Sequence, residues 1–397
     1  MRKIFPSHQK TRNYIFIGLV VTSVLAGLGL AFTFLLPDAV LSEQKAVAIS
    51  LVDLSEQESG KVYPEAMFWE AMADNQVQCQ LCFQNCVIPE GQRGICRVRI
   101  NHAGRLYTQV HSRVASWQVM PVEKDTMQHL HPGASVFAIA TASCNLRCKQ
   151  CHNWSITQRY PEDIRYFYWP PEEIVRRAMA SGSTFISGTM NEPTVFFEYL
   201  YDIFPLAQEA GIKTMFRSNA MMNPEPLQTI LQYTDAVSLD LKGFSDDFHR
   251  KILGGELQPA LDTLKLLRDS GVWFEITNLI IPTLNDDMED IRRMVEWIKE
   301  NLGPDVPMHF NRFVPAFQLT HLPMTPVSTL EQAYHIAREV GLNYVYIGNV
   351  PGHPSNSTFC PGCGTNLVHR THLAVLYNRI ADGRCPDCGK KIAGVWE

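Results

Sequence analysis

The chain has little surplus charge of either sign. Its 397 residues include 35 Lys and Arg against 40 Asp and Glu, giving a net charge of −5, and 19% of the residues are charged. Nucleic-acid binding usually needs a basic surplus, so the composition favours no nucleic-acid partner. The sequence also lacks an internal repeat and a low-complexity tract. Its 46% hydrophobic content and its length predict a folded protein with about two to four domains.

Charge is missing altogether from one N-terminal segment. No charged residue stands between Arg12 and Asp38, and residues 14–36 are almost wholly apolar. At about 1.5 Å per residue this run spans roughly 35 Å, enough to cross a hydrocarbon core about 30 Å thick. We expect an uncleaved membrane anchor, because the run exceeds the roughly 7–15 apolar residues of a signal peptide. A buried core helix and a cleaved signal peptide are the alternatives.

No cysteine is left over when the 11 cysteines are grouped along the chain. The groups are Cys79, Cys82, Cys86 and Cys96, then Cys144, Cys148 and Cys151, then Cys360, Cys363, Cys385 and Cys388. Disulfide frameworks rarely distribute in this way, whereas paired Cys-x2-Cys motifs favour metal. Metal thiolates also indicate reducing surroundings.

The middle group has the spacing Cys-x3-Cys-x2-Cys. Three thiolates on one short loop can hold three irons of a [4Fe–4S] cluster and leave the fourth iron open. An open iron can chelate the amino and carboxylate groups of S-adenosylmethionine and pass an electron to its sulfonium. The loop follows an apolar run at residues 136–140, as a first barrel strand requires. A zinc site or three unrelated buried thiols are the alternatives.

The outer cysteine groups predict further metal sites. The last group forms two Cys-x2-Cys-Gly knuckles, which are typical of a tetrahedral structural zinc site, with a rubredoxin-type single iron as the alternative. The first group has the spacing Cys-x2-Cys-x3-Cys-x9-Cys. Zinc and an auxiliary iron–sulfur cluster both suit that spacing.

From Ser135 onwards, short apolar runs alternate with helical segments. The expected strands cover residues 136–141, 185–187, 213–217, 236–241, 273–281, 307–313 and 344–348. Repeated β-α units predict an α/β fold, a parallel sheet curved into a partial or full TIM-like barrel, with its chemistry at the C-terminal ends of the strands. The predicted domains are an N-terminal transmembrane anchor (1–37), a tether (38–75), a Cys-rich module (76–133), the barrel (134–350) and a zinc ribbon (351–397).

Polar residues follow several of these strands and are candidates for binding S-adenosylmethionine. After the second strand, small residues permit close backbone approach, and Asn191 and Glu192 can accept hydrogen bonds from an ammonium group. A polar turn that caps the next helix is the alternative. The full candidate set is Ser187, Gly188, Asn191, Glu192, Ser218, Asn219, Asp240, Lys242 and His309.

The candidates on the later strands have two interpretations each. Asp240 and Lys242 can bind ribose hydroxyls or the methionyl carboxylate, or can simply form an ion pair with each other. His309 can contact the cofactor or be a hydrogen-bonded core histidine.

Together these motifs resemble the radical-SAM proteins of the AmmeMemoRadiSam system, within the wider group of pyruvate formate-lyase activating enzyme-like proteins. The matching stretches are residues 79–82, 93–101, 144–148, 151–158, 191–194, 240–244, 279–282 and 344–352. The resemblance implies a [4Fe–4S] cluster on the middle cysteines and reductive cleavage of S-adenosylmethionine to methionine and a 5′-deoxyadenosyl radical. Two departures are Gln150, where the family usually has an aromatic residue, and Gly188–Glu192, which replaces a Gly-Gly-Glu motif.

We therefore expect an enzyme whose radical abstracts hydrogen from a substrate. The resemblance to activating enzymes implies a protein or peptide substrate and a low-potential electron donor of the flavodoxin or ferredoxin type. The alternatives are a membrane-tethered zinc scaffold without catalysis and an electron-transfer protein with several iron centres.

The expected location is a membrane, with the side left open. Four basic residues precede the apolar run and Lys45 alone follows it closely, so the positive-inside rule sends the body of the chain outward. The cofactor and its electrons, by contrast, are cytoplasmic.

Overall fold

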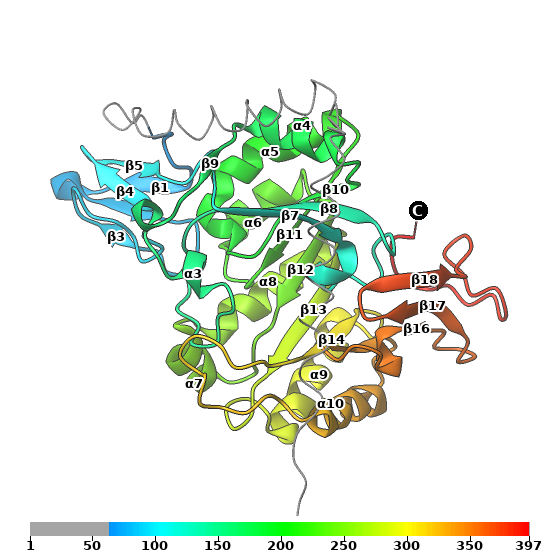
Figure 1. Ribbon diagram of the computed structural model, residues 1–397. Helices are drawn as coiled ribbons and strands as arrows, with labels where there is room; N and C mark the ends of the chain where they lie inside the picture. Colours follow the sequence, from blue (N-terminus) through cyan, green and yellow to red (C-terminus); the bar gives the residue numbers. More distant parts are fainter. Residues whose placement is uncertain (1–62, 397) are drawn as a thin grey trace, which may run out of the picture. The chain divides into compact units, whose positions relative to one another are not determined.

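One eight-stranded sheet organises residues 63–396, the part of the chain that the computed structural model describes (Figure 1). The strand order is β15-β14-β13-β12-β11-β10-β8-β7. All neighbours pair in parallel except β7, which runs antiparallel to β8 at one edge. The strands are β7 (Ser116–Pro121), β8 (Ser135–Ala140), β10 (Phe185–Gly188), β11 (Lys213–Ser218), β12 (Ala236–Asp240), β13 (Trp273–Ile280), β14 (Met308–Arg312) and β15 (Val345–Gly348). The sheet begins and ends in edge strands, so the barrel is partial.

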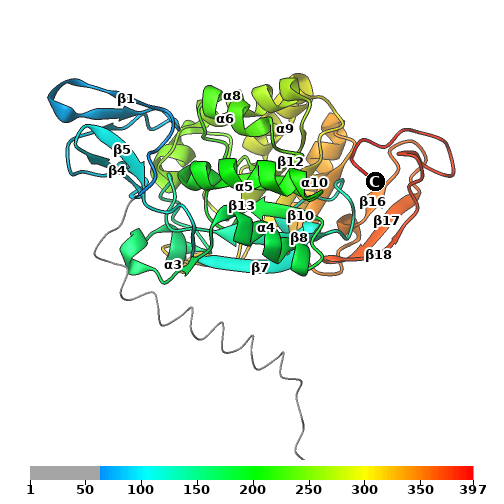
Figure 2. The ribbon, with the colours of Figure 1, turned by 90° about the horizontal axis from the view of Figure 1, so that it is seen from above.

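Helices connect the parallel strands and cover one face of the sheet (Figures 1 and 2). The longer ones are α4 (Pro171–Ala180), α5 (Phe197–Glu209), α6 (Pro224–Leu231), α8 (Leu257–Ser270), α9 (Met288–Leu302) and α10 (Val327–Val340), and the short ones are α3 (Trp154–Thr157) and α7 (Asp246–Phe248). Their ends follow local sequence signals. The Asp287 side chain caps α9 by accepting from two backbone N–H groups, and α8 ends at Gly271 in the left-handed conformation.

The two faces of the sheet differ in polarity, because successive side chains of a strand point to opposite sides. In β12, Val237 and Leu239 pack into the core shared with the helices. Asp240 of the same strand lines a cavity on the opposite face, as do Thr277 of β13 and His309 of β14. The polar inner face is therefore where the structure offers room for a ligand.

The cysteine-rich N-terminal part forms small antiparallel sheets. They comprise β1 (Trp69–Ala71), β2 (Val77–Cys79) and β3 (Val87–Ile88), the hairpin of β4 (Arg99–His102) and β5 (Arg105–Thr108), and the pair β6 (Arg113–Val114) and β9 (Phe167–Tyr168). The expected tether is wrong at its C-terminal end, because β1 lies within it and pairs with β2. Residues 38–62 of that tether lie outside the described residues.

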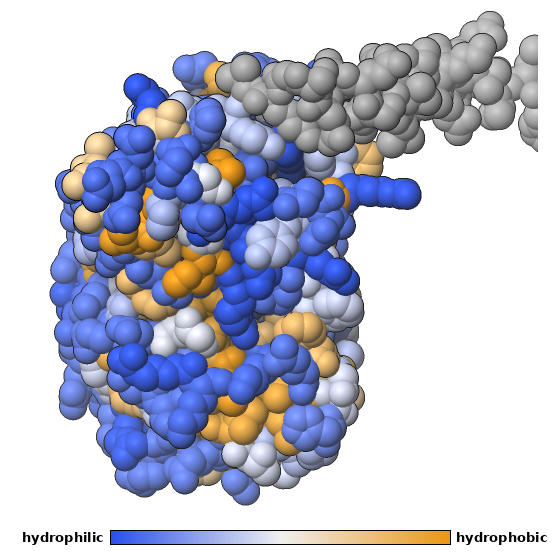
Figure 3. Space-filling view, turned by 90° about the vertical axis from the view of Figure 1, so that its left-hand side faces the viewer, coloured by the Kyte–Doolittle hydropathy of each residue, from blue (hydrophilic) through white to orange (hydrophobic). Residues whose placement is uncertain are grey.

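Figure 3 shows the face on the left of Figure 1 as mostly hydrophilic, with scattered apolar patches.

The C-terminal segment folds as a three-stranded antiparallel sheet of β16 (Thr358–Phe359), β17 (Asn366–Thr371) and β18 (Ala374–Asn378). Arg370 of β17 is fully buried and reaches the short helix η3 (Val122–Asp125), where its Nε lies 3.3 Å from Glu123. Its Nη2 donates to the Gln128 carbonyl at 2.6 Å. This contact joins the end of the chain to the segment that precedes β8.

The structure corrects the expected membrane location. Among residues 63–396, no helix is both long and apolar enough to cross a bilayer. The apolar run at residues 14–36, which carried that expectation, lies outside the described residues. The described residues therefore give no support to a membrane anchor, to its orientation or to a membrane partner.

Replacing Arg370 with Met should lower the free energy of unfolding by about 3–5 kcal/mol, because it leaves Glu123 charged, buried and without its cation. Urea denaturation of the purified protein measures the change. The matched control is Arg292→Met, which removes an exposed ion pair with Glu339 and should cost less than about 1 kcal/mol. Equal losses in the two variants would contradict the role assigned to Arg370.

Candidate active site

A cavity of about 700 Å³ opens at the C-terminal ends of the parallel strands, on the polar face of the sheet. The lining comes from the loop after β8, from the ends of β10 to β15, and from η3. Cys144, Cys148 and Cys151 are the cysteines among the described residues of this lining. Parallel α/β folds place ligands at this end of the sheet, so the triad stands where the sequence predicted it.

The loop that carries the triad is fixed to its neighbours by backbone hydrogen bonds. The N–H of Arg147 donates to the Leu253 carbonyl at 2.8 Å, and that of Lys149 donates to the Ile252 carbonyl at 3.0 Å. Both acceptors lie in the π-helical turn η6 (His249–Leu253). The three thiols are therefore held on a supported backbone, as ligands of one metal centre must be.

The environment of Cys144 favours a cationic partner. Burial raises the pKa of this thiol well above its usual value, and the nearby Glu192 carboxylate raises it further. Burial likewise raises the pKa of Cys148 to about 12. Thiols in such surroundings become thiolates when a metal ion supplies the positive charge.

Asn191 holds the triad loop instead of facing the cavity freely. Its side chain accepts from the Thr141 N–H at 3.1 Å and donates to the Ser143 carbonyl at 3.0 Å. It also donates to the Thr141 hydroxyl at 3.2 Å. The side chain also borders the cavity, and its Oδ1 keeps a second lone pair, so the predicted ammonium contact stays a prediction. Asn191 positions the segment that leads into Cys144.

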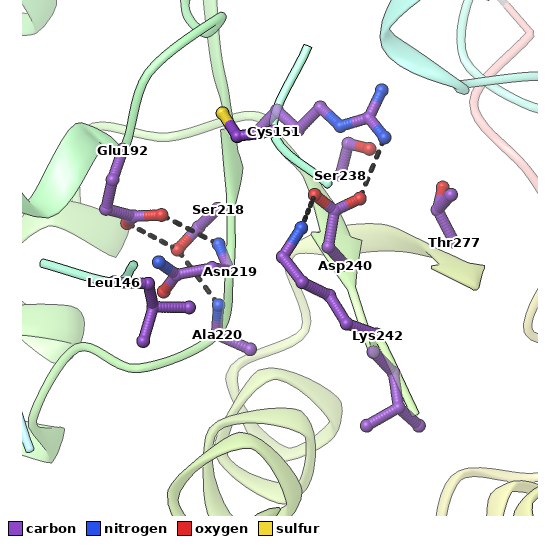
Figure 4. Close-up of polar contacts among 12 residues, drawn as sticks. Leu146, Cys151, Glu192, Ser218, Asn219, Ala220, Ser238, Asp240, Lys242 and Thr277 are labelled. Carbon is purple, nitrogen blue, oxygen red and sulfur yellow. Dashed lines mark hydrogen bonds and ion pairs between the residues drawn. The ribbon is translucent and has the colours of Figure 1, made fainter. Parts of the chain in front are cut away.

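Glu192 is the centre of a buried hydrogen-bond network (Figure 4). Its carboxylate accepts from the Ser218 hydroxyl at 2.8 Å and from the Asn219 N–H at 2.8 Å. It also accepts from the N–H and the hydroxyl of Thr194. Burial raises the pKa of Glu192, while these hydrogen bonds lower it. Glu192 therefore braces the ends of β10 and β11.

Asn219 extends this network to the cysteine loop. Its Nδ2 donates to the Asn145 Oδ1 at 2.8 Å and lies 3.9 Å from the Cys144 sulfur. Its Oδ1 is buried and has no partner among the described residues. A buried acceptor without a partner costs free energy, so this atom is suited to receive a donor from a ligand in the cavity.

Asp240 and Lys242 form an ion pair, as one of the two sequence interpretations proposed (Figure 4). The Lys242 Nζ lies 2.7 Å from one Asp240 oxygen, and the Arg217 Nη2 lies 2.8 Å from the other. Burial would raise the pKa of Asp240, but the two cations outweigh it and hold that pKa at about 2. Burial alone would lower the pKa of Lys242, but its interactions with Asp240 and Cys148 raise that pKa. The site thus carries two cations around one carboxylate.

Three other candidates have structural contacts. Gly188 faces the helices, because an added Cβ would lie 2.7 Å from the Leu200 side chain. Ser187 is buried and donates to Asp125 at 2.8 Å. His309 borders the cavity but lies 2.7 Å from the Glu275 carboxylate and stacks on Tyr346, so the core-histidine interpretation describes its contacts. A cofactor contact is not expected of Ser187 or Gly188.

The sequence analysis missed Arg217 and Asp125. Arg217 stands in the largely buried strand β11 and borders the cavity, so a lone arginine in a buried strand was the available signal. Asp125 belongs to η3, outside the predicted barrel, and accepts from Thr189 at 2.8 Å. Nothing in its local sequence indicated that it would reach the sheet.

Further unpartnered acceptors show that the lining suits a polar ligand. Gln150 Oε1 and Asn311 Oδ1 are buried, border the cavity and have no partner among the described residues. Gln150 occupies the position before the third cysteine, where the family usually has an aromatic residue. Its amide offers hydrogen bonding where an aromatic side chain would offer stacking. Three cysteines, two cations and several acceptors thus fit a cluster with S-adenosylmethionine.

The C-terminal cysteines form a compact group away from this cavity. Cys360, Cys363, Cys385 and Cys388 have sulfur atoms that all lie within 4.8 Å of one another. Two of the sulfur pairs are 3.6 Å apart. Tetrahedral zinc–thiolate geometry requires separations of about 3.8 Å, so the group fits such an ion.

Comparison with known proteins agrees with the site. Residues 139–298 match the model of the Radical SAM superfamily, and this stretch includes the triad. An uncharacterized protein of Methanocaldococcus jannaschii is 41% identical over 330 residues, which cover 83% of this chain and 98% of that protein. Pyruvate formate-lyase-activating enzyme of Listeria monocytogenes is 29% identical over 181 residues, covering 41% of this chain and 69% of the enzyme.

A solved structure also resembles part of the chain. A domain of pyruvate-formate lyase-activating enzyme from Bacteroides vulgatus has a TM-score of 0.36 and 18% sequence identity, covering 41% of this chain and 98% of that domain. The family match and the long, highly similar relative carry the assignment. The chain belongs to the radical SAM superfamily.

Proposed function

We propose that the protein reductively cleaves S-adenosylmethionine on a [4Fe–4S] cluster held by Cys144, Cys148 and Cys151. The observation that supports this most directly is the position of the triad. The three cysteines border a cavity of about 700 Å³ at the C-terminal end of a parallel sheet, and the cavity contains unpartnered polar atoms. When bound, the cluster supplies the electron that breaks the C5′–S bond and yields methionine and a 5′-deoxyadenosyl radical.

Some residues around the cavity would bind S-adenosylmethionine, and others hold the cavity loops in place. Lys242 and Arg217 offer the cations for the methionyl carboxylate. The free Oδ1 of Asn219 offers an acceptor for the ammonium group. Asn191 and Glu192 position the loops that carry these atoms. The enclosing strands exclude water from the reacting atoms, which protects a radical from side reactions.

The substrate class and the electron donor follow by analogy. The chain is similar to pyruvate formate-lyase-activating enzymes, whose name describes action on another protein. We propose a protein or peptide as the hydrogen donor and a flavodoxin- or ferredoxin-like protein as the source of the electron. Membership of the AmmeMemoRadiSam group, supported by motifs such as residues 93–101, is part of this proposal.

The proposal also includes structural zinc on Cys360, Cys363, Cys385 and Cys388. Their close spacing supports it, and they belong to the segment that follows β15 in the sequence. In this view the Cys-rich module, the radical SAM barrel and the zinc ribbon are separate parts of one chain. The zinc would stabilise the ribbon and take no part in the reaction.

Replacing Cys148 with Ala should abolish 5′-deoxyadenosine formation, because two thiolates cannot hold the cluster with one iron open. The assay uses anaerobically reconstituted protein, dithionite and S-adenosylmethionine, with the nucleoside measured by chromatography. Zinc content serves as the internal control, since the C-terminal group should keep about one ion per chain. Cleavage at the wild-type rate in this variant would disprove the cluster assignment.

Replacing Lys242 with Met should weaken S-adenosylmethionine binding by about 10- to 100-fold, the effect of losing one charge-assisted hydrogen bond. Equilibrium binding to the reconstituted protein measures the dissociation constant. Lys251→Met is the matched control, because Lys251 forms an exposed pair with Asp247 away from the cavity lining. A dissociation constant that is unchanged in Lys242→Met would remove this residue from the binding site.

A further inference from the structure

The first cysteine group surrounds a second, smaller cavity. Cys79, Cys82, Cys86 and Cys96 all border it. Cys79 ends strand β2, Cys82 and Cys86 lie in the turn between β2 and β3, and Cys96 lies in the loop before β4. All four are free thiols, and Cys79 and Cys82 are buried. Four thiols that border one cavity suit a metal centre, and no disulfide joins them.

The separation of the sulfur atoms distinguishes this group from the C-terminal one. Zinc–sulfur bonds of about 2.3 Å place four tetrahedral thiolates about 3.8 Å apart. The C-terminal group has this compact arrangement, with sulfur pairs at 3.6 Å. Within residues 63–396 it is the one cysteine set with three or more sulfur atoms mutually within 4.8 Å. No three sulfur atoms of the first group meet that limit, and the three of the Cys144 triad do not meet it either, so both groups are wider.

The wider spacing fits a polynuclear cluster. Each cysteine of an iron–sulfur cube binds a different iron, so the sulfur atoms stand further apart than around a single ion. The triad, with its radical SAM spacing, shows that open arrangement in this chain. The first group therefore resembles the proposed cluster site of this chain and differs from its proposed zinc site.

Two buried donors border the same cavity without a partner. Arg99 is 1% exposed, and its Nε makes no hydrogen bond among the described residues. Asn145 is also 1% exposed, and its Nδ2 has no partner. The Arg99 Nη1 already lies 3.5 Å from the Cys79 sulfur. N–H donors of this kind stabilise the negative charge on thiolates and on inorganic sulfide.

The second cavity adjoins the loop of the triad. Asn145 borders it and directly follows Cys144 in the sequence. Arg147 links the two loops, because its guanidinium donates to the carbonyl of Cys144 at 2.8 Å and to that of Ile95. Gln84 also donates to the Asn145 carbonyl, at 3.3 Å. Hydrogen bonds thus connect the two cysteine sites directly.

We propose that Cys79, Cys82, Cys86 and Cys96 bind a second iron–sulfur cluster, which passes single electrons to the cluster on the triad. A low-potential protein donor loses one electron to the second cluster, and that electron moves on to the first. The relay rests on the proposed function, whereas the cluster itself does not.

The decisive variant is Cys144→Ala/Cys148→Ala/Cys151→Ala, which removes the triad and leaves the second site intact. After anaerobic reconstitution it should retain about four iron and about four sulfide per chain, and its dithionite-reduced form should give a cluster EPR signal that S-adenosylmethionine does not change. Iron-free protein, or zinc at this site in addition to the C-terminal ion, would overturn the proposal. If the wild type binds iron but never cleaves S-adenosylmethionine, the proposed function fails, and this iron count still decides the second cluster.

The reciprocal variant is Cys82→Ala/Cys96→Ala. It should lose about half of the wild-type iron while the remaining cluster still responds to S-adenosylmethionine by EPR. Cleavage should be lost with a flavodoxin-type donor and kept with dithionite, a small reductant that does not need the relay. Cleavage at wild-type rates with both reductants would overturn the relay. Should this variant not fold, the triad variant decides the cluster.

Discussion

A single buried carboxylate organises the active end of this molecule. Glu192 accepts hydrogen bonds from Ser218 and from the N–H of Asn219, so it joins the end of β10 to the end of β11. Asn219 then contacts the loop of Cys144 through Asn145. A buried acid without these donors would be costly, so the loops and the acid stabilise one another. The geometry of the cysteine triad depends on this arrangement.

The sheet was largely predictable because its strands are short apolar runs separated by clear helix signals. The expected run 136–141 is β8, and the expected run 236–241 is β12. The triad was also identifiable, because its spacing is a local property of the sequence. Parallel strands in an α/β unit bring such loops to one edge, so their meeting there followed from topology.

Side-chain direction and long-range partners were not predictable in the same way. Gly188 faces the helices and Asn191 contacts the triad loop, although Gly188 ends β10 and Asn191 follows only three residues later. A shift of one residue reverses the face of a strand residue, and the sequence does not state which face is inner. Asp125 reaches the sheet from outside the barrel segment, so local patterns could not reveal it. Cysteine spacing likewise left the first group open between zinc and an auxiliary iron–sulfur cluster.

The contacts between the C-terminal segment and the segment that precedes β8 have a consequence for how the protein is made. Arg370 and Val395 belong to the last part of the chain, yet Arg370 pairs with Glu123 and Val395 bonds to the backbone of His129. A ribosome adds about 5–20 residues per second and releases the C-terminus last. The barrel strands are therefore exposed for several seconds before these contacts form, so a nascent chain that stalls before residue 370 leaves Glu123 without its cation.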